Sequence, residues 1–497
     1  MSINSITTSL SPIHPLKGEF DVEKAEASSS TAIDTENVLV KGKLMEEFLS
    51  AVSSVAIHAS NRLGIIEKLK ENPTSIEMLS SELNLSAKHL SRTLAVLGKL
   101  KLVEVKGEQY ELTELGSRLD FYSKGEREAI YHGALWIELC TASDVLTGEH
   151  PLIEKVAALL HDGRIGHEEK QLYDLATNYL WSRIIYFAVE LNLADRIASG
   201  TRSTDSLANS LHLDEGALRI LLELLQEKGI IYEEGSMWNL TERGQELRIS
   251  KPGSLAHHII FDDTKRWECL GLIDESIRCG AIPFEEKYGE LFEYLKENPS
   301  ESKKFDLAMD TITTLESAEL LKSGVFDGAS EIVEIGGGRG LFLSSIMEKY
   351  PDMKGVLFDL PSVANHENVL LELSEENFRD RVSIVGGSFF EFVPKSCGMY
   401  CMKRVLHDWD DDHVVSIFKQ IEKNMLPGAK IAIIEPLLSE GDERITPELI
   451  DFYMMPLLEG RERSMSEMER LLNAAGFELT GKQIVGSFLS ILVAEKK

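Results

Sequence analysis

Leucines recur at three- and four-residue spacing in two separate stretches of the chain, residues 63–116 and 191–244. The two stretches align without a gap when residue 63 is set against residue 191, an offset of 128 residues. In each stretch the helical spacing gives way to alternating apolar and polar residues around a glycine. The first spacing is typical of a helix with one buried face, and alternation is typical of a strand. The pattern therefore predicts three helices and a hairpin, a winged helix, in both copies.

A winged helix can bind DNA by placing its third helix in the major groove. In the second copy this helix carries Asp214, Glu215 and Glu223 beside Arg219, and the first copy has no continuous basic stripe either. The whole chain has 52 Lys and Arg against 82 Asp and Glu, a formal net charge of −30. Such a surface repels phosphate backbones and anionic lipid. We therefore expect packing or dimerisation modules, with no nucleic-acid partner and no membrane partner.

Beyond about residue 330, short apolar runs of strand length alternate with stretches of helical spacing. This alternation predicts a mostly parallel sheet with helices on both faces. Ligands of such sheets bind beyond the carboxyl ends of the strands. The runs expected as strands are residues 330–335, 354–361, 382–390, part of 397–409, and 429–436.

A glycine-rich segment, VEIGGGRG at residues 333–340, follows the first of these runs. It lacks the lysine of a nucleoside-triphosphate loop, and Leu341 stands where a dinucleotide-binding loop has its last small residue. An acidic residue followed by GxGxG suits a ligand without a pyrophosphate, such as S-adenosylmethionine (SAM), because glycines let the backbone approach the amino-acid part of the cofactor. Asp359 ends the next strand, where its carboxylate can accept hydrogen bonds from both ribose hydroxyls. The loop residues expected at the cofactor are Glu334, Gly336 and Gly338, with Gly340 completing the pattern.

The remaining bulk features set limits on cofactors and location. The five cysteines show no paired ligand spacing, which predicts no metal site and reduced thiols in a cytoplasmic protein. No apolar run approaches the ~20 residues of a membrane span. The N-terminus lacks the basic start and apolar centre of a secretory signal. Residues 1–42, rich in Ser and Thr, are expected to form a disordered tail.

The second half of the chain resembles the dimeric, plant-type small-molecule O-methyltransferases, which include caffeate, acetylserotonin and hydroxyneurosporene methyltransferases. The resemblance covers about residues 170–497, including the second winged helix. It implies an α/β, Rossmann-like class I methyltransferase domain with a mostly parallel sheet, here preceded by two tandem helical winged-helix modules. The segments that carry it, in family order, are VEIGGGRG, FDLP, GGSFF, KRVLHDWDD, IIEP and DFYMMPLLEGRERSMSEMERLLNAAGF.

The resemblance implies SAM-dependent methyl transfer to a hydroxyl of a small aromatic or phenolic acceptor, with His407 as the general base. A phenol has a pKa near ~10, and a histidine, with a pKa near ~6.5, can take its proton. Glu435 and Glu462 match the carboxylates that flank this histidine, and a carboxylate on the far ring nitrogen fixes the tautomer. By the same matching, Ser388 and Phe389 lie beside the adenine, Lys403 contacts the cofactor, and Met454 shapes the acceptor pocket.

The resemblance and the repeat together divide the chain into parts and predict its assembly. Relatives pair through the winged-helix region, and part of that surface closes the partner's acceptor pocket, so we expect a homodimer. The first module is expected to pack on the second or to extend the dimer contact. The parts are a disordered tail (1–42), a first winged-helix-like module (43–155), a second winged-helix dimerisation module (170–250), a helical linker and acceptor-pocket region (251–329) and a SAM-binding catalytic domain (330–497).

Two departures from the family pattern leave other functions open. Ser388 stands where members usually have Asp, and a hydroxyl binds the adenine amino group more weakly than a carboxylate does. Gly398 stands where Asp often precedes the tyrosine of the fourth strand. One alternative is a SAM-binding member with non-methylating chemistry, such as decarboxylation, hydroxylation or rearrangement. The other is a winged-helix DNA-binding regulator, which the net charge disfavours.

Overall fold

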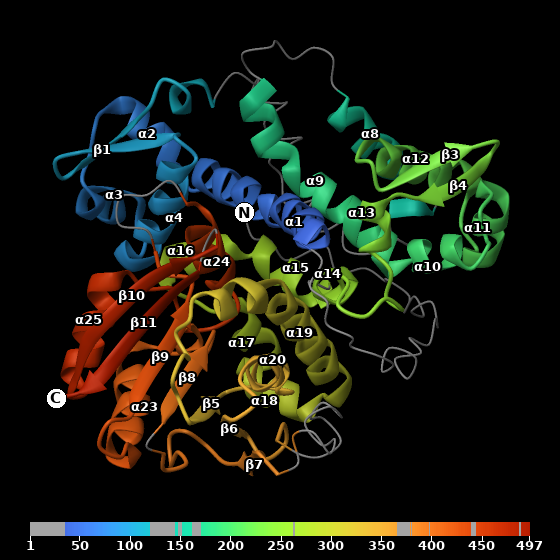
Figure 1. Cartoon of the computed structure of the whole chain (residues 1–497). Helices are drawn as coiled ribbons and strands as arrows, with labels where there is room; N and C mark the ends of the chain where they lie inside the picture. The colour runs from blue at the N-terminus through green and yellow to red at the C-terminus, as the bar shows by residue number, and fades with distance from the viewer. Residues whose placement is uncertain are drawn as a thin grey trace.

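The computed structural model describes residues 35–119, 145–147, 152–161, 170–261, 264–364, 378, 380–396, 398–438, 444–486 and 489–497. In Figure 1 the two winged-helix modules stand at the top, the first in blue on the left and the second in green on the right. The catalytic domain, in yellow to red, lies beneath them. Most of the expected tail lies outside the described residues. From Thr35 the chain is helical, so residues 35–42 belong to the first module rather than to a tail.

Among the described residues, a seven-stranded sheet forms the catalytic domain, in the order β10-β11-β9-β8-β5-β6-β7. The strands β5 to β9 run parallel to one another, and β10 and β11 add an antiparallel pair at one edge. The mostly parallel sheet is confirmed, and its parallel strands are those expected; the antiparallel pair was not foreseen. The bounds are β5 (Glu331–Ile335), β6 (Lys354–Asp359), β7 (Val382–Gly386), β8 (Met399–Lys403), β9 (Lys430–Glu435), β10 (Phe477–Val485) and β11 (Leu489–Lys496).

Alternate residues of the central strands enter two hydrophobic cores, one on each face of the sheet. Val333 and Ile335 of β5 pack with the apolar faces of α23 and α25, whereas Ile332 packs with α20. Burial on both faces explains why these strands are nearly continuous apolar runs in the sequence. The covering helices are α20 (Leu341–Lys349), α23 (Asp411–Asn424) and α25 (Met465–Ala474).

Each winged-helix module has the predicted helices and hairpin, and each begins with an additional long helix. The first module comprises α1 (Thr35–Arg62), α2 (Ile65–Glu71), α3 (Ile76–Leu83), α4 (Ala87–Lys99), β1 (Val103–Lys106) and β2 (Gln109–Leu112). The second comprises α9 (Lys170–Glu190), α10 (Leu193–Ala198), α11 (Thr204–Leu211), α12 (Glu215–Glu227), β3 (Ile231–Glu234) and β4 (Met237–Leu240).

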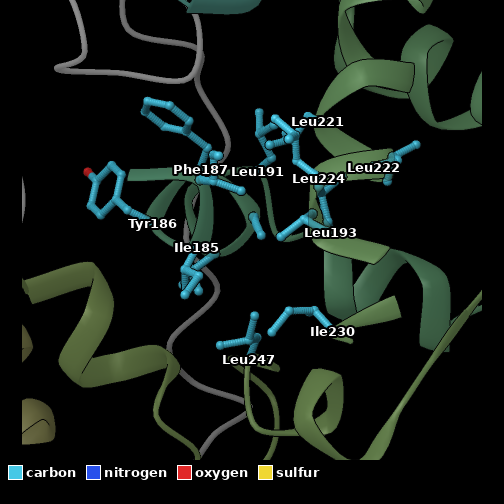
Figure 2. Packing of buried hydrophobic residues seen from close by; sticks show 14 of the residues in the cluster. Ile185, Tyr186, Phe187, Leu191, Leu193, Leu221, Leu222, Leu224, Ile230 and Leu247 are labelled. Carbon is cyan, nitrogen blue, oxygen red and sulfur yellow. The ribbon is translucent and has the colours of Figure 1, made fainter. Parts of the chain in front are cut away.

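The core of the second module lies between the long helix α9 and the helix α12. Figure 2 shows Leu193, at the start of α10, beside Leu221 and Leu224 of α12. These three side chains are almost fully buried. The helix α9 is apolar on nearly all sides because its own module covers one side and α1 covers another.

A chain of helices links the second module to the sheet and covers the carboxyl ends of its strands. The last of them, α19, packs against α14 and α20 and leads into β5. The bounds are α14 (Ala256–Phe261), α15 (Thr264–Gly271), α16 (Ile273–Cys279), α17 (Pro283–Tyr288), α18 (Leu291–Glu297) and α19 (Pro299–Lys322). One further helix, α24 (Thr446–Met454), follows β9 and packs against α4 and α1 of the first module.

Candidate active site

A cavity of about 1280 Å³ lies beyond the carboxyl ends of β5, β6 and β8. Its wall combines the glycine loop, α19, the turn after β8, α24 and part of α1. A single small ligand typically occupies roughly 300–1,000 Å³, so this cavity has room for a cofactor and an acceptor together. The expected site residues that line it are Glu334, Gly336, Gly338, Asp359, Ser388, Phe389, Lys403, His407 and Met454.

The glycine loop holds its shape through the carboxylate of Asp359. The backbone N–H of Gly338 donates to Asp359 Oδ2 at 2.8 Å, and that of Leu360 donates to Oδ1 at 2.7 Å. Burial raises the pKa of Asp359, while these two N–H donors lower it. Gly336 has a φ of 69°, and a Cβ there would lie 2.7 Å from Val405 Cγ2, so both the backbone and the available space require glycine.

Glu334 is a buried carboxyl group beside the same loop. It is 2% exposed, and its Oε2 atom has no hydrogen-bond partner among the described residues. Burial raises the pKa of Glu334 to about 8, and the charge of Lys403 acts in the opposite direction. An unpaired buried carboxyl oxygen is unfavourable unless a ligand satisfies it. A cationic amine in the cavity, such as the amino group of SAM, would supply that partner.

Lys403 ends β8 and reaches the helix that covers the cavity. Its Nζ donates to Thr313 Oγ1 at 3.0 Å and to Glu316 Oε2 at 3.4 Å. Arg404 follows with a φ of 54° and donates to Glu316 Oε1 from two nitrogens, at 2.9 and 2.7 Å. The two cations lower the pKa of Glu316 against the effect of its burial. This network fixes α19 against the end of β8.

Ser388 and Phe389, which the family resemblance places beside the adenine, follow β7 and line the cavity. The Ser388 Oγ accepts from the N–H of Phe390 at 3.3 Å, so the hydroxyl closes a local turn. The Phe389 ring stands edge-on to Trp409, with centroids 5.8 Å apart. The other departure, Gly398, has a steric explanation, because a Cβ there would lie 2.0 Å from the carbonyl oxygen of Glu331.

His407 lies in the short turn after β8, and its ring is held by carboxylates. Its Nδ1 is 2.7 Å from Glu462 Oε1 and 3.8 Å from Glu435 Oε2. The other ring nitrogen, Nε2, lies 3.6 Å from Asp408 Oδ1, and the side chain lines the cavity with 12% exposure. The bond to Glu462 fixes the ring through Nδ1, and Nε2 takes no part in that bond. The expected grouping of His407, Glu435 and Glu462 is therefore present.

The carboxyl groups around His407 are buried, and that of Glu435 is held by the backbone. Glu435 Oε1 accepts from the N–H groups of Val405 and Leu406, at 3.0 and 2.8 Å. Burial raises the pKa of Glu435 and of Glu462, and a positive His407 lowers that of Glu435. Burial also raises the pKa of Asp408 to about 7. The charge on this cluster is therefore coupled to the proton on His407.

Two residues that hold the turn around His407 in place were not predicted from the sequence. Arg463 is buried and donates to the carbonyl oxygens of Leu406 and Trp409, at 2.9 and 2.6 Å. Gly460 packs so closely that a Cβ there would lie 2.0 Å from the His407 carbonyl oxygen. Both residues stand within or beside the GRERS segment, but the sequence gives no direct sign of these contacts.

Two acidic residues of α19 also line the cavity and were not expected there. Asp306 and Asp310 are one helical turn apart, so both point to the same side. Burial, together with the charge of Asp310, raises the pKa of Asp306 to about 7. Arg339 of the glycine loop donates to Asp310 Oδ2 at 2.9 Å. The four-residue spacing of the two acids was the available signal in the sequence.

The same histidine and carboxylates have the composition of a cation site. Within the described part of the chain, ligand atoms of His407, Glu435 and Glu462 lie within 4.8 Å of one another. The cysteine spacing predicted no metal site, but that spacing does not bear on a site made of histidine and glutamate. A chelator control therefore belongs in any activity measurement.

Comparisons with known proteins agree with this geometry. The O-methyltransferase domain family matches residues 271–478, and the O-methyltransferase dimerisation domain family matches residues 45–119. The mitomycin biosynthesis 6-O-methyltransferase of Streptomyces lavendulae is 30% identical over 63% of this chain and 89% of its own. The 3-amino-4-hydroxybenzoate 4-O-methyltransferase of Streptomyces cremeus is 32% identical over 62% of this chain and 85% of its own.

One similar solved structure contains ligands. It is an O-methyltransferase from neocarzinostatin biosynthesis in complex with S-adenosylmethionine and 2-hydroxy-5-methyl naphthoic acid. The similarity has a TM-score of 0.54 and 26% identity, over 63% of this chain and 95% of the other.

These matches show how the chain differs from its relatives. Almost the full length of each relative aligns with only about two thirds of this chain. This is expected if one winged-helix module is additional. The dimerisation domain matches the first module, whereas the sequence analysis gave the dimerisation role to the second. Within the part of the chain that the structure describes, no helix is long and apolar enough to cross a membrane.

Proposed function

The chain belongs to the family of SAM-dependent O-methyltransferases, and we propose that His407 is the general base that activates the acceptor hydroxyl. The observation that carries this proposal is the bond between His407 Nδ1 and the buried carboxylate of Glu462, at 2.7 Å, beside a cavity large enough for two ligands. The acceptor class that we propose is a small aromatic metabolite with a free hydroxyl.

The residues around the glycine loop fit the cofactor. SAM supplies a methyl group on a sulfonium centre, which an oxygen nucleophile can take in an in-line displacement. We propose that Asp359 binds the ribose hydroxyls, and that Glu334 binds the amino group through its free Oε2. Phe389 and Ser388 would lie against the adenine, and Lys403 would contact the cofactor from the end of β8.

We propose that His407 takes the proton of the acceptor through Nε2. Because Nδ1 bonds to Glu462, the tautomer that donates from Nδ1 leaves a lone pair on Nε2. When the ring becomes positive, Glu462 and Glu435 lie 2.7 and 3.8 Å from Nδ1 and stabilise it. General-base help of this kind is typically worth 10² to 10⁴ in rate.

Aromatic side chains support an aromatic acceptor. Phe292 stacks on Trp409 with centroids 5.9 Å apart and an interplanar angle of 14°, and both residues line the cavity. Met454, 6% exposed, lies on the α24 wall with Tyr453. Flat apolar walls of this kind suit a planar ring, which can pack against them in an offset or edge-on arrangement.

Incubation with methyl-labelled SAM and a panel of phenols, read by mass spectrometry, tests the proposed function. The expected result is transfer of the label to at least one phenolic oxygen, with equal rates in the presence and absence of a chelator. Consumption of an acceptor without transfer of the label would favour the non-methylating alternative, for which Ser388 in place of Asp leaves room. Loss of transfer on chelation would assign the His407 cluster to a metal instead.

The dimerisation domain supports pairing through the winged-helix region. A homodimer and a cytoplasmic location remain predictions of the sequence. The structure adds that the chain carries two such modules in contact with each other, and this bears on which surfaces are left for a second chain.

A further inference from the structure

We propose that the two modules pair with each other inside one chain, so that the first module takes the place of a partner chain and closes the acceptor cavity in cis. The inference concerns the same cavity and therefore rests in part on the proposed function. It assigns a role to the additional module that the family resemblance left unexplained.

The repeat is as regular in structure as in sequence. Both long helices end at equivalent positions, α1 at Arg62 and α9 at Glu190, which are 128 residues apart. The following helices and strands begin at the same offset, from α2 and α10 through to β2 and β4. The two modules are therefore two copies of one unit, as two subunits of a homodimer would be.

Contacts between the two long helices are reciprocal. The Ser54 hydroxyl of α1 donates to the carbonyl oxygen of Leu175 at 2.6 Å. At the equivalent position of α9, the Ser182 hydroxyl donates to the carbonyl oxygens of Phe48 at 2.8 Å and of Glu47 at 3.4 Å. Because Glu47 is the repeat equivalent of Leu175, each serine bonds to the same position of the other copy. Such exchange of roles is the mark of a two-fold interface.

The hydrophobic cores are exchanged in the same way. Leu44 of α1 belongs to the core of the second module, and its repeat equivalent, Leu172 of α9, belongs to the core of the first. The segments that follow the modules behave alike. Val145 packs in the core of the second module, and Ile273, 128 residues further on, packs in the core of the first. Each module is therefore completed by helices from the other copy.

Only the second module is followed by a catalytic domain, and the first module contributes to its site. Met45, Leu49 and Val52 of α1 line the cavity. Arg92 of α4 is buried and donates to Asp451 Oδ2 at 2.8 Å. The other oxygen of Asp451 accepts from the Glu462 N–H at 2.9 Å, and Glu462 holds His407. The first module thus both walls the cavity and supports the carboxylate behind the histidine.

The consequence is that a complete site needs one chain. The pairing surface of each module is already covered by the other, so a homodimer would have to use a different surface and would not be required for turnover. Specific activity should stay constant on dilution through the nanomolar range, where a site shared between chains would lose activity with the dimer.

Complementation between two inactive variants tests the proposal. Leu49→Trp fills the acceptor side of the cavity from α1, and His407→Ala removes the base; retention of SAM binding by each variant shows that it is folded. The two chains are expressed together with different tags and purified through both. Pairing in cis predicts no recovered activity. If α1 closed the cavity of a second chain, one of the two sites in each doubly tagged pair would be intact, so about half of native activity would return, and that result would overturn the proposal.

A second readout does not depend on methyl transfer. Thermal unfolding of the native chain should give the same Tm over a hundredfold range of concentration, because no association through the paired modules contributes to stability. Pairing in cis would be overturned if the Tm of the native chain rose with concentration while the Tm of Ser54→Arg did not. If no phenol is methylated by the native chain, the proposed function fails, and the pairing is then judged on this measurement.

Discussion

At the scale of single residues, the site depends on buried carboxyl groups whose charge is set by what lies beside them. Glu462 and Glu435 have raised pKa values because they are buried, yet each accepts a bond or lies near a group that favours its charged form. Burial likewise raises the pKa of Asp359, and two backbone N–H donors act to lower it. Such groups respond strongly to ligands, because a nearby charge in a dry site is weakly screened.

The contribution of Asp359 to cofactor binding can be measured directly. Asp359→Ala removes the expected ribose contact and also the acceptor for the Gly338 N–H, so SAM affinity should fall by more than tenfold, equivalent to about 1.5–3 kcal/mol for a bond to a charged group. Titration calorimetry checks this. Native affinity in the variant would place the ribose elsewhere in the cavity.

Cofactor affinity should depend on pH through Glu334. Its pKa of about 8 in the free protein means that the carboxyl group is mostly protonated at pH 7. A cationic amine favours the carboxylate, so binding at pH 7 should expel a proton, and affinity should rise as pH increases toward 8. Calorimetry in buffers of different ionisation enthalpy measures the proton release. Glu334→Gln is the control, and equal release from that variant would assign the proton to another group, with Asp306 the next to be examined.

The expected site residues that line the cavity could be predicted, because they stand in short segments with a recognisable order. The residues behind them could not. Arg463 donates to the backbone carbonyl oxygens of Leu406 and Trp409. Every residue type has such an oxygen, so the sequence at those two positions does not reveal the contact. Arg92 lies 359 residues from Asp451 in the sequence, and only folding brings them together.

At the scale of elements, the turn after β8 is held from two sides. Glu435 binds its N–H groups, and Arg463 binds its carbonyl oxygens. The close approach of Gly460 lets the segment that carries Glu462 lie against the backbone of His407. The histidine is therefore positioned by backbone contacts as well as by its own ring.

The close approach at Gly460 predicts that a single methyl group will be disruptive. In Gly460→Ala the Cβ would lie 2.0 Å from the His407 carbonyl oxygen, so the turn must shift. Overpacking of this kind typically costs about 1–3 kcal/mol, and displacement of His407 should lower kcat as well. Thermal unfolding and steady-state kinetics check both effects.

Gly98→Ala is the matched control, because its Cβ would have its nearest neighbour at 3.8 Å and the site lies within a helix. That variant should be neutral or slightly stabilised. Native stability and native kcat in Gly460→Ala would contradict the close packing described for the turn.

The parallel strands could be predicted because burial on both faces makes them apolar throughout. The antiparallel pair β10 and β11 was missed because its outer strand faces solvent; Ile484, for example, is 57% exposed. The first residues of α1 were missed for a related reason. Thr35 to Gly42 read as polar tail, and their helical conformation continues a helix whose partner, α9, lies more than a hundred residues further on.

At the scale of the whole molecule, the catalytic site is assembled from distant parts of one chain. The sheet provides the glycine loop, and α19, α24 and α1 of the first module provide other walls of the cavity. The internal repeat predicted that two modules of the same fold exist. It did not reveal that each completes the core of the other, because a repeat defines units and not the contacts between them.

The measurement that most directly tests the account is single-turnover transfer of a labelled methyl group by the native chain and by His407→Ala. We predict that His407→Ala slows transfer by about 10² to 10⁴, while SAM affinity stays close to native because the histidine faces the acceptor. His161→Ala is the matched control, since its exposed imidazole bonds to Glu227 of α12 and does not line the cavity. It should transfer at the native rate. Transfer at the native rate by His407→Ala would contradict the account.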